Sequence, residues 1–128
     1  MPVPLNRILY VEDEPDIRVV AKMALEAVGG FTVSACASGL EALIAAPDAR
    51  ADLLLLDVMM PGMDGISTLK ALREIPSTAH TPVIFMTAKV QVAEVEVYKK
   101  LGALEVISKP FDPMELSAQI ARIWASQS

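Results

Sequence analysis

The run of four leucines from Leu53 to Leu56, followed directly by Asp57, constrains the fold more than any other stretch of the chain. Four apolar residues in a row leave no polar face, which is typical of a strand buried on both sides in a parallel sheet. A helix is the competing interpretation, but Pro61-Gly62 would stop a helix soon after the run. The run therefore predicts a central strand with Asp57 at its carboxyl end. In open α/β sheets, ligands and chemistry are found at that edge.

The composition fits one domain with an aliphatic core. The chain has 128 residues, and we expect a single domain over residues 1–128 with its core at about residues 7–124. The hydrophobic fraction is 53%, but the aromatic fraction is only 5%, so aliphatic residues and methionine must fill the core. Eleven basic and sixteen acidic residues give a net charge of -5 without a basic cluster. We therefore expect no nucleic-acid contact and favour a cationic ligand.

The sequence also predicts a cytoplasmic location. Its one cysteine, Cys36, cannot form an internal disulfide bond. The first four residues have neither the charged nor the apolar region of a signal peptide. No stretch approaches the length of a membrane span, so we expect no membrane contact.

Short apolar segments alternate with segments of helical periodicity. The predicted strands cover residues 7–11, 31–35, 53–57, 82–87 and 105–108. Capping residues, prolines and 3.6-residue spacing predict helices that begin near Pro15, Ser38, Asp64, Val90 and Asp112. Gly29-Gly30 should close the first helix, Pro47 should end the second, and residues 77–81 should form a polar connection.

The segment 90–101 is the most ambiguous part of the chain. Its valines alternate as in a strand, whereas its position and the following Gly102 favour a helix. We interpret it as a helix of low intrinsic propensity, because β-branched residues lose side-chain freedom in a helix. At least some of its valines must then face outward, namely Val90, Val92, Val95 and Val97.

This alternation predicts an α/β fold: a doubly wound, five-stranded parallel sheet with helices on both faces, which is a flavodoxin-like three-layer sandwich. The long apolar strands at 7–11, 53–57 and 82–87 should be central. The segment 31–35 should lie nearer the sheet edge, because its apolar residues alternate with polar ones. These features favour the strand order 2-1-3-4-5.

Polar residues follow the strands that this order brings together. Glu12 and Asp13 follow the first strand, Asp57 ends the third, Thr87 ends the fourth, and Lys109 follows the fifth. The carboxyl ends of parallel strands meet at one edge of the sheet, so these side chains should gather there. Taken alone, Thr87 could be a simple cap and Lys109 a solvated charge. Their joint placement favours a functional site.

Three carboxylates in one crevice repel one another unless a proton or a cation intervenes. Oxygen ligands without nearby His or Cys select a hard ion, and a site with few protein oxygens and room for water suits Mg²⁺. Asp57 could then attack a phosphoryl group as a nucleophile. Mg²⁺, Lys109 and the Thr87 hydroxyl would each meet one phosphoryl oxygen.

Four motifs resemble the receiver domain of two-component response regulators: Leu53 to Asp57, Met60-Pro61-Gly62-Met63-Asp64-Gly65, Thr87-Ala88 and Lys109-Pro110-Phe111. The resemblance covers about residues 7–124. It implies that Asp57 accepts a phosphoryl group from a phosphohistidine in a sensor histidine kinase or a histidine phosphotransfer protein. It further implies a phosphoacceptor that assists its own phosphorylation and dephosphorylation, and not an enzyme.

The resemblance assigns individual roles as well. Asp13, Asp57 and the backbone carbonyl of Met59 would bind Mg²⁺, with Glu12 acting through water. Thr87 would sense the phosphoryl group and Lys109 would pair with it. The Lys109-Pro110 peptide bond is expected to be cis.

Two positions depart from the family pattern. The family usually has an aromatic residue three positions before the lysine, where this chain has Val106, and the first acid is Glu12 where aspartate is common. A branched valine is too short to swing between a buried and an exposed position. We therefore expect the loop and helix at 88–101 to carry the phosphorylation signal. A homodimer or a downstream partner would use the face formed by helix 90–101, strand 105–108 and helix 113–124.

Three other functions were weighed. A flavin-binding domain of this architecture needs phosphate-binding donors after the first strand, where Glu12-Asp13-Glu14 would repel a phosphate. A metal-dependent phosphatase needs a second acid two residues after Asp57, where Met59 stands. The stronger rival is a degenerate receiver that binds proteins independently of phosphorylation. The chain is expected to be either a stand-alone receiver or the receiver of a longer protein.

Overall fold

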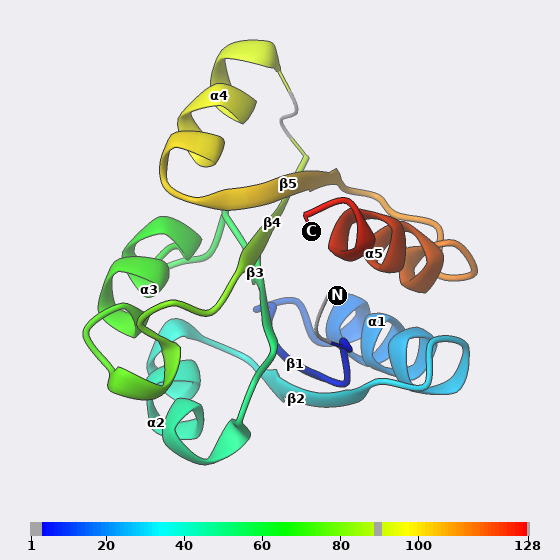
Figure 1. Cartoon of the computed structure of the whole chain (residues 1–128), viewed down its shortest axis with the longest axis horizontal. Helices are drawn as coiled ribbons and strands as arrows, with labels where there is room; N and C mark the ends of the chain where they lie inside the picture. Colours follow the sequence, from blue (N-terminus) through cyan, green and yellow to red (C-terminus); the bar gives the residue numbers. More distant parts are fainter. Residues whose placement is uncertain (1–3, 89–90, 128) are drawn as a thin grey trace.

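The computed structural model describes residues 4–88 and 91–127 and consists of three layers (Figure 1). Five parallel strands form one sheet in the order β2-β1-β3-β4-β5. The strands are β1 (Arg7–Val11), β2 (Thr32–Cys36), β3 (Leu53–Asp57), β4 (Val83–Thr87) and β5 (Ala103–Ser108). The predicted α/β class, doubly wound topology and strand order are confirmed.

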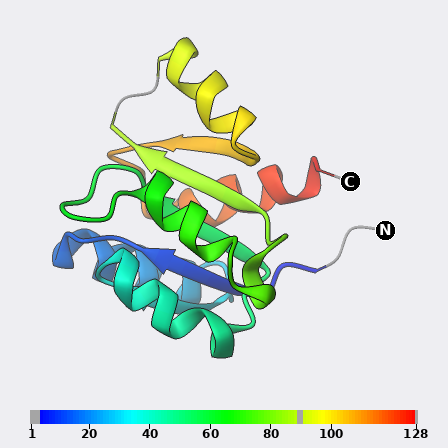
Figure 2. The ribbon, with the colours of Figure 1, turned by 90° about the vertical axis from the view of Figure 1, so that its left-hand side faces the viewer.

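Within the described residues, five α-helices cover the sheet. The two views at right angles show helices on both of its faces (Figures 1 and 2). Helices α1 (Pro15–Ala27) and α5 (Leu116–Ala125) pack on one face. The other face is covered by α2 (Gly39–Ala49), α3 (Gly65–Leu72) and α4 (Val92–Lys100). None of the helices in the described part of the chain is long and apolar enough to cross a membrane.

The leucine run of β3 has no polar residue because both faces of the strand are buried in this sandwich. Leu53 and Leu55 point into the apolar layer under α1 and α5, whereas Leu54 and Leu56 point into the layer under α2, α3 and α4. All four are fully buried. As expected, the strand with alternating apolar residues, β2, lies at an edge of the sheet.

The predicted end of the second helix was wrong. Pro47 lies inside α2, which continues to Ala49. A proline lacks the N–H group that would bond to the carbonyl of Leu43, but the residues after it can keep helical dihedral angles. The helix ends where Arg50 takes a left-handed conformation, with φ of 51°.

The predicted start of the last helix was wrong as well. Asp112 caps a turn: its side chain accepts the Met114 N–H (2.9 Å), and its carbonyl accepts the Glu115 and Leu116 N–H groups (3.0 Å each). The helix α5 begins only at Leu116. Smaller differences are a one-residue shift of β2, an earlier start of β5, and a 3₁₀ turn at Pro76–Thr78 within the predicted polar connection.

The ambiguous segment is a helix, α4, as predicted. It covers Val92–Lys100, and Val92 and Val97 are exposed, with 78% and 52% of their surface accessible. Val95 packs partly against the core. Val90, the other valine expected to face outward, lies outside the described residues.

Candidate functional site

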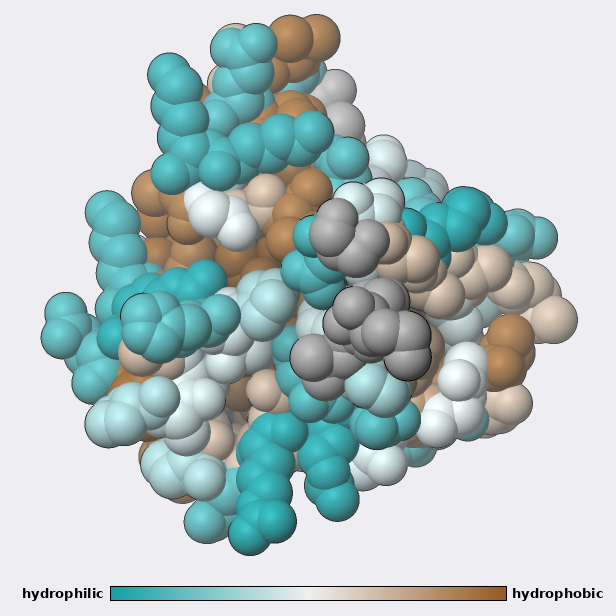
Figure 3. Space-filling view, viewed as in Figure 1, coloured by the Kyte–Doolittle hydropathy of each residue, from teal (hydrophilic) through white to brown (hydrophobic). Residues whose placement is uncertain are grey.

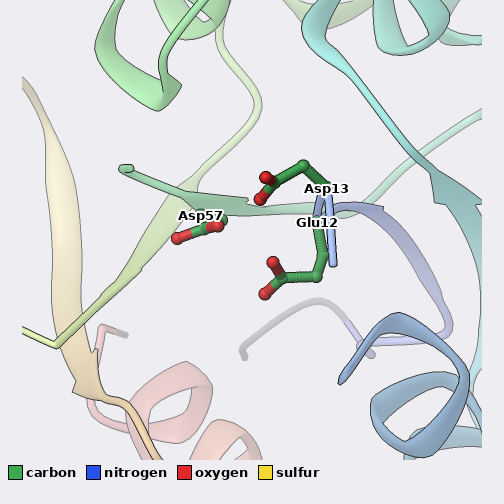
Figure 4. A group of neighbouring side chains, drawn as sticks. All are labelled: Glu12, Asp13 and Asp57. Carbon is green, nitrogen blue, oxygen red and sulfur yellow. The ribbon is translucent and has the colours of Figure 1, made fainter. Parts of the chain in front are cut away.

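Three carboxylates meet at the carboxyl edge of the sheet (Figure 4). Glu12, Asp13 and Asp57 each offer a carboxylate oxygen, and these atoms lie within 4.8 Å of one another. Glu12 is fully buried, Asp57 is 1% exposed, and Asp13 is half-buried. The sheet order alone brings these residues together, because β1 and β3 are neighbours.

The turn after β3 fixes the position of Asp57. The Gly65 N–H donates to the Val58 carbonyl (2.9 Å), which brings the start of α3 against the end of the strand. A Cβ atom at position 65 would collide with the Asp57 carbonyl oxygen, so glycine is needed for this close approach. Asp64 then caps α3 by accepting the Ser67 N–H (2.8 Å). The motif from Met60 to Gly65 therefore builds the support beneath Asp57.

The side chain of Lys109 bridges two of the three carboxylates. Its Nζ atom donates to Glu12 Oε1 at 2.8 Å and lies 3.3 Å from Asp57 Oδ2. The Lys109 N–H donates to the Thr87 carbonyl (2.9 Å), and the Lys109-Pro110 bond is cis, as expected. Lys109 thus lies beside Glu12 and Asp57 at the carboxyl edge of the sheet, and its hydrogen bond to Glu12 was not predicted.

Thr87 and Met59 complete the set of predicted residues. Thr87 is the last residue of β4 and is 1% exposed. Met59 lies two residues after Asp57 and is 62% exposed, in a loop that lines a shallow cavity of about 430 Å³ with Val58, Pro61 and Asp64.

The electrostatics of this cluster favour the binding of a cation. Burial raises the pKa of Asp57 to about 7, the neighbouring Glu12 adds to the increase, and Lys109 opposes it. Burial lowers the pKa of Lys109, but the hydrogen bond and charge of Glu12 and the charge of Asp57 outweigh it, so the net direction is upward. One ammonium group thus compensates part of the negative charge of three carboxyl groups.

The donor set fits a hard divalent ion such as Mg²⁺. Both carboxylate oxygens of Asp57 are buried and accept no hydrogen bond from the described residues. The group consists of carboxylates only, with no His or Cys among its members. Oxygen ligands of this kind, with space left for water, are typical of Mg²⁺ sites. A bound ion would contact the two Asp57 oxygens, which have the ion pair with Lys109 but no hydrogen bond from the described residues.

An apolar hollow of about 400 Å³ lies beside Lys109, and sequence reasoning missed it. It is lined by Ile17 and Val20 of α1 and by Pro110, Phe111 and Pro113 of the segment after β5. These segments are far apart in sequence, so only the fold reveals the hollow. Arg18 was missed too; its side chain donates to the Glu12 carbonyl at 2.9 Å. The spacing of Arg18 from Glu12 gave no signal of this contact.

Comparison with known proteins gives a consistent result. The family model described as "Response regulator receiver domain" matches residues 8–121. The transcriptional regulatory protein CpxR of Escherichia coli K12 is 41% identical over 128 residues, which cover 96% of this chain and 53% of that protein. The DNA-binding response regulator MtrA of Mycolicibacterium smegmatis is 36% identical over 115 residues, 90% of this chain and 49% of that protein. The chain thus spans about half the length of these relatives.

Solved structures agree with the sequence comparison. The chemotaxis protein CheY4 of Vibrio cholerae superimposes with a TM-score of 0.84 at 32% identity, covering 94% of this chain and 99% of that one. The receiver domain of the Francisella response regulator 1452 superimposes with a TM-score of 0.81 at 29% identity, covering 96% and 100% of the two chains.

Proposed function

The chain belongs to the response regulator receiver domain family of two-component systems, and from this we propose that Asp57 accepts a phosphoryl group from a phosphohistidine. The observation that carries the proposal is the buried Asp57 carboxylate, with two further acids within 4.8 Å and the Lys109 ammonium 3.3 Å away. The donor would be a sensor histidine kinase or a histidine phosphotransfer protein. An Asp57 oxygen forms a bond to phosphorus, the bond from phosphorus to the histidine nitrogen breaks, and the imidazole leaves.

The proposed cofactor is Mg²⁺, which would neutralise developing charge on the phosphoryl oxygens. Asp13, Asp57 and the carbonyl of Met59 would hold the ion, with Glu12 acting through water. Lys109 would pair with one phosphoryl oxygen and the Thr87 hydroxyl would donate to another. The protein would thus assist its own phosphorylation and dephosphorylation as a phosphoacceptor, and not act as an enzyme on other substrates.

The apolar hollow beside Lys109 supports a protein as the donor. Its walls include Ile17 and Val20, and the outer side of α1 carries further exposed apolar residues, Val19 and Met23. Exposed apolar surface next to a reactive group is typical of a contact with another protein. A phosphohistidine carried by a protein that docks here would lie close to Asp57.

The experiment that tests this function is labelling with acetyl phosphate in the presence of Mg²⁺. The intact protein should gain the mass of one phosphoryl group, and hydroxylamine should remove the label, because it cleaves acyl phosphates and leaves phosphate esters intact. A label that resists hydroxylamine would show a phosphoester instead and would contradict the proposal. A complete lack of labelling would favour the alternative, a degenerate receiver that binds proteins independently of phosphorylation.

Replacing Met59 by Asn should accelerate the loss of the phosphoryl group, by less than the roughly 100-fold or more that a positioned general base contributes, because an amide only orients the water. Hydrolysis needs a water molecule aligned behind phosphorus, and the thioether of Met59 offers that water at most a weak hydrogen bond. Because Met59 is exposed, the substitution should leave the core unchanged. The measurement is the decay of the phosphorylated protein after removal of the donor. Equal decay in Met59→Asn and Met59→Leu would contradict this account.

The phosphorylation signal is proposed to pass through residues 88–101. Tyr98 is the one buried side chain of α4, and its ring lies 5.3 Å from the Phe85 ring of β4. Phe85 and Thr87 point to the same face of the sheet, since they are two residues apart in a strand. Val106 lies opposite Phe85 and is itself buried, so the aromatic contact comes from the helix. A displacement of Thr87 would reach α4 along this short path.

The amide chemical shifts should test this path. Addition of beryllofluoride and Mg²⁺, which mimic the phosphoryl group, should change the shifts of residues 88–101 most strongly outside the immediate site. Replacing Tyr98 by Leu should reduce those changes, whereas Phe at this position should preserve them. Large changes confined to residues 105–108 would contradict the path.

The surface of α4, β5 and α5 is the proposed output face. Val92 and Val97 of α4 are exposed. The space-filling view shows further hydrophobic surface between α4 and α3, outside this face (Figure 3). Phosphorylation would change the contacts of this face with a downstream protein, a fused output domain or a second copy in a homodimer. We propose that the domain works in the cytoplasm and contacts neither nucleic acid nor membrane itself.

A further inference from the structure

Tyr10 carries a polar group into the centre of the sheet. It lies in β1, none of its surface is exposed, and its hydroxyl has no hydrogen-bond partner among residues 4–88 and 91–127. An unpaired hydroxyl in the interior lowers stability, so a buried tyrosine normally finds a partner. The fold alone therefore does not account for the hydroxyl group of Tyr10.

The strand register places Tyr10 directly beneath the acidic site. Tyr10 lies opposite Leu55 in the parallel pair of β1 and β3. Glu12 lies two residues after Tyr10, and Asp57 lies two residues after Leu55. Glu12 keeps the extended pairing of β1 with β2, because its N–H donates to the Cys36 carbonyl at 3.0 Å. Side chains two residues apart share a face, so the ring of Tyr10 lies one layer below both carboxylates.

The surroundings keep the Tyr10 hydroxyl protonated. Burial raises its pKa, and the negative charges of Glu12 and then Asp57 raise it further, while Arg18 has a weaker opposite effect. The phenol therefore remains a hydrogen-bond donor.

The carboxylate oxygens above Tyr10 differ in how well they are paired. Glu12 Oε1 accepts from Lys109 Nζ at 2.8 Å, and Glu12 Oε2 accepts from the Glu14 N–H at 3.2 Å. Both oxygens of Asp57 are buried without a hydrogen bond from the described residues. Asp57 Oδ2 has only the ion-pair contact with Lys109 at 3.3 Å, so a donor and an acceptor that both lack a hydrogen bond from the described residues lie in the same region, on neighbouring strands.

We propose that Tyr10 is a positioning residue of the cation site, acting through a buried water molecule that accepts from its hydroxyl and donates to the Asp57 carboxylate. Such a water needs two to four polar partners, and the Tyr10 hydroxyl and the Asp57 carboxylate supply two of them. The hydrogen bond fixes the orientation of Asp57 as a ligand. Outer hydrogen bonds of this kind typically change metal affinity by about 10–100-fold. This inference rests on the proposed Mg²⁺ site.

The test is the affinity for Mn²⁺, a paramagnetic substitute for Mg²⁺, measured by electron paramagnetic resonance without any phosphodonor. Replacing Tyr10 by Phe should weaken binding by roughly tenfold. The matched control is Tyr98→Phe, which removes the chain's other tyrosine hydroxyl and should leave the affinity unchanged. Without the ion, Tyr10→Phe should unfold within a few degrees of the wild type, because it loses one water-mediated hydrogen bond but keeps the packing of the ring.

The outcomes separate this inference from the proposed function. If wild type binds Mn²⁺ and Asp13→Asn does not, but Tyr10→Phe binds within about twofold of wild type, the role of Tyr10 is wrong and the cation site stands. Weaker binding together with a much larger drop in unfolding temperature would indicate a packing defect and also overturn the inference. If neither wild type nor Asp13→Asn binds Mn²⁺, both the cation site and the role of Tyr10 are contradicted.

Discussion

Chelation of divalent cations should reduce the labelling of this protein by acetyl phosphate by about a hundredfold or more, because a bound metal ion supplies several kcal/mol of charge stabilisation. Three carboxyl groups face one ammonium group at the site. Without a cation, an incoming phosphoryl group would meet uncompensated negative charge. Asp57, with a pKa of about 7, would also be partly protonated at neutral pH and hence a poorer nucleophile.

Replacing Asp13 by Asn should have the same effect as chelation. Asp13 is half-buried and makes no ion pair in the described structure, so its carboxylate is free to bind a cation. The measurement is the fraction of labelled protein by intact mass after a fixed time, with Mg²⁺ or with a chelator. The matched control is Asp48→Asn, which removes an exposed acid from α2. Equal labelling of Asp13→Asn and Asp48→Asn would contradict a metal ligand at position 13.

The fold could be predicted because its main signals are local. The leucine run has no polar face, and alternation distinguishes the edge strand β2 from the central ones. Strand ends then bring Glu12, Asp57 and Lys109 to one edge by topology alone. Each of these steps needs only the order of residues along the chain.

Prediction from the sequence failed where contacts between distant segments of the chain determine the structure. The hollow beside Lys109 needs α1 to lie next to the segment after β5, and the pairing of Lys109 with Glu12 depends on which carboxylate its long side chain reaches. The boundary errors have local causes. Pro47 does not end α2, because the last turn of the helix tolerates a proline, and Asp112 caps a separate turn before α5.

Val106 shows how sequence and structure together refine one expectation. From the sequence, the short branched side chain argued against a swinging ring in β5. In the structure, Val106 is buried opposite Phe85, and the ring of Tyr98 packs against Phe85 from α4. The aromatic contact near Thr87 is thus present but comes from a different element. No spacing rule in the sequence indicated this, because the contact joins α4 to a strand.

The second large effect is expected at Asp57, the nucleophile on which the whole account depends. Replacing Asp57 by Asn keeps the shape of the side chain but removes the charged oxygen that would attack phosphorus. The asparagine also loses the ion pair with Lys109 but carries no buried charge, so the fold should persist. Labelling should fall to the background level, a loss larger than any other substitution here should cause.

The most direct measurement is the intact mass of wild type, Asp57→Asn and the control Asp52→Asn after incubation with acetyl phosphate and Mg²⁺. We expect wild type and Asp52→Asn to gain one phosphoryl group each, and Asp57→Asn to gain none while it shows the circular dichroism of a folded protein. A phosphoryl group on folded Asp57→Asn, at the rate and extent of wild type, would show that the acceptor is another residue and would contradict the central claim.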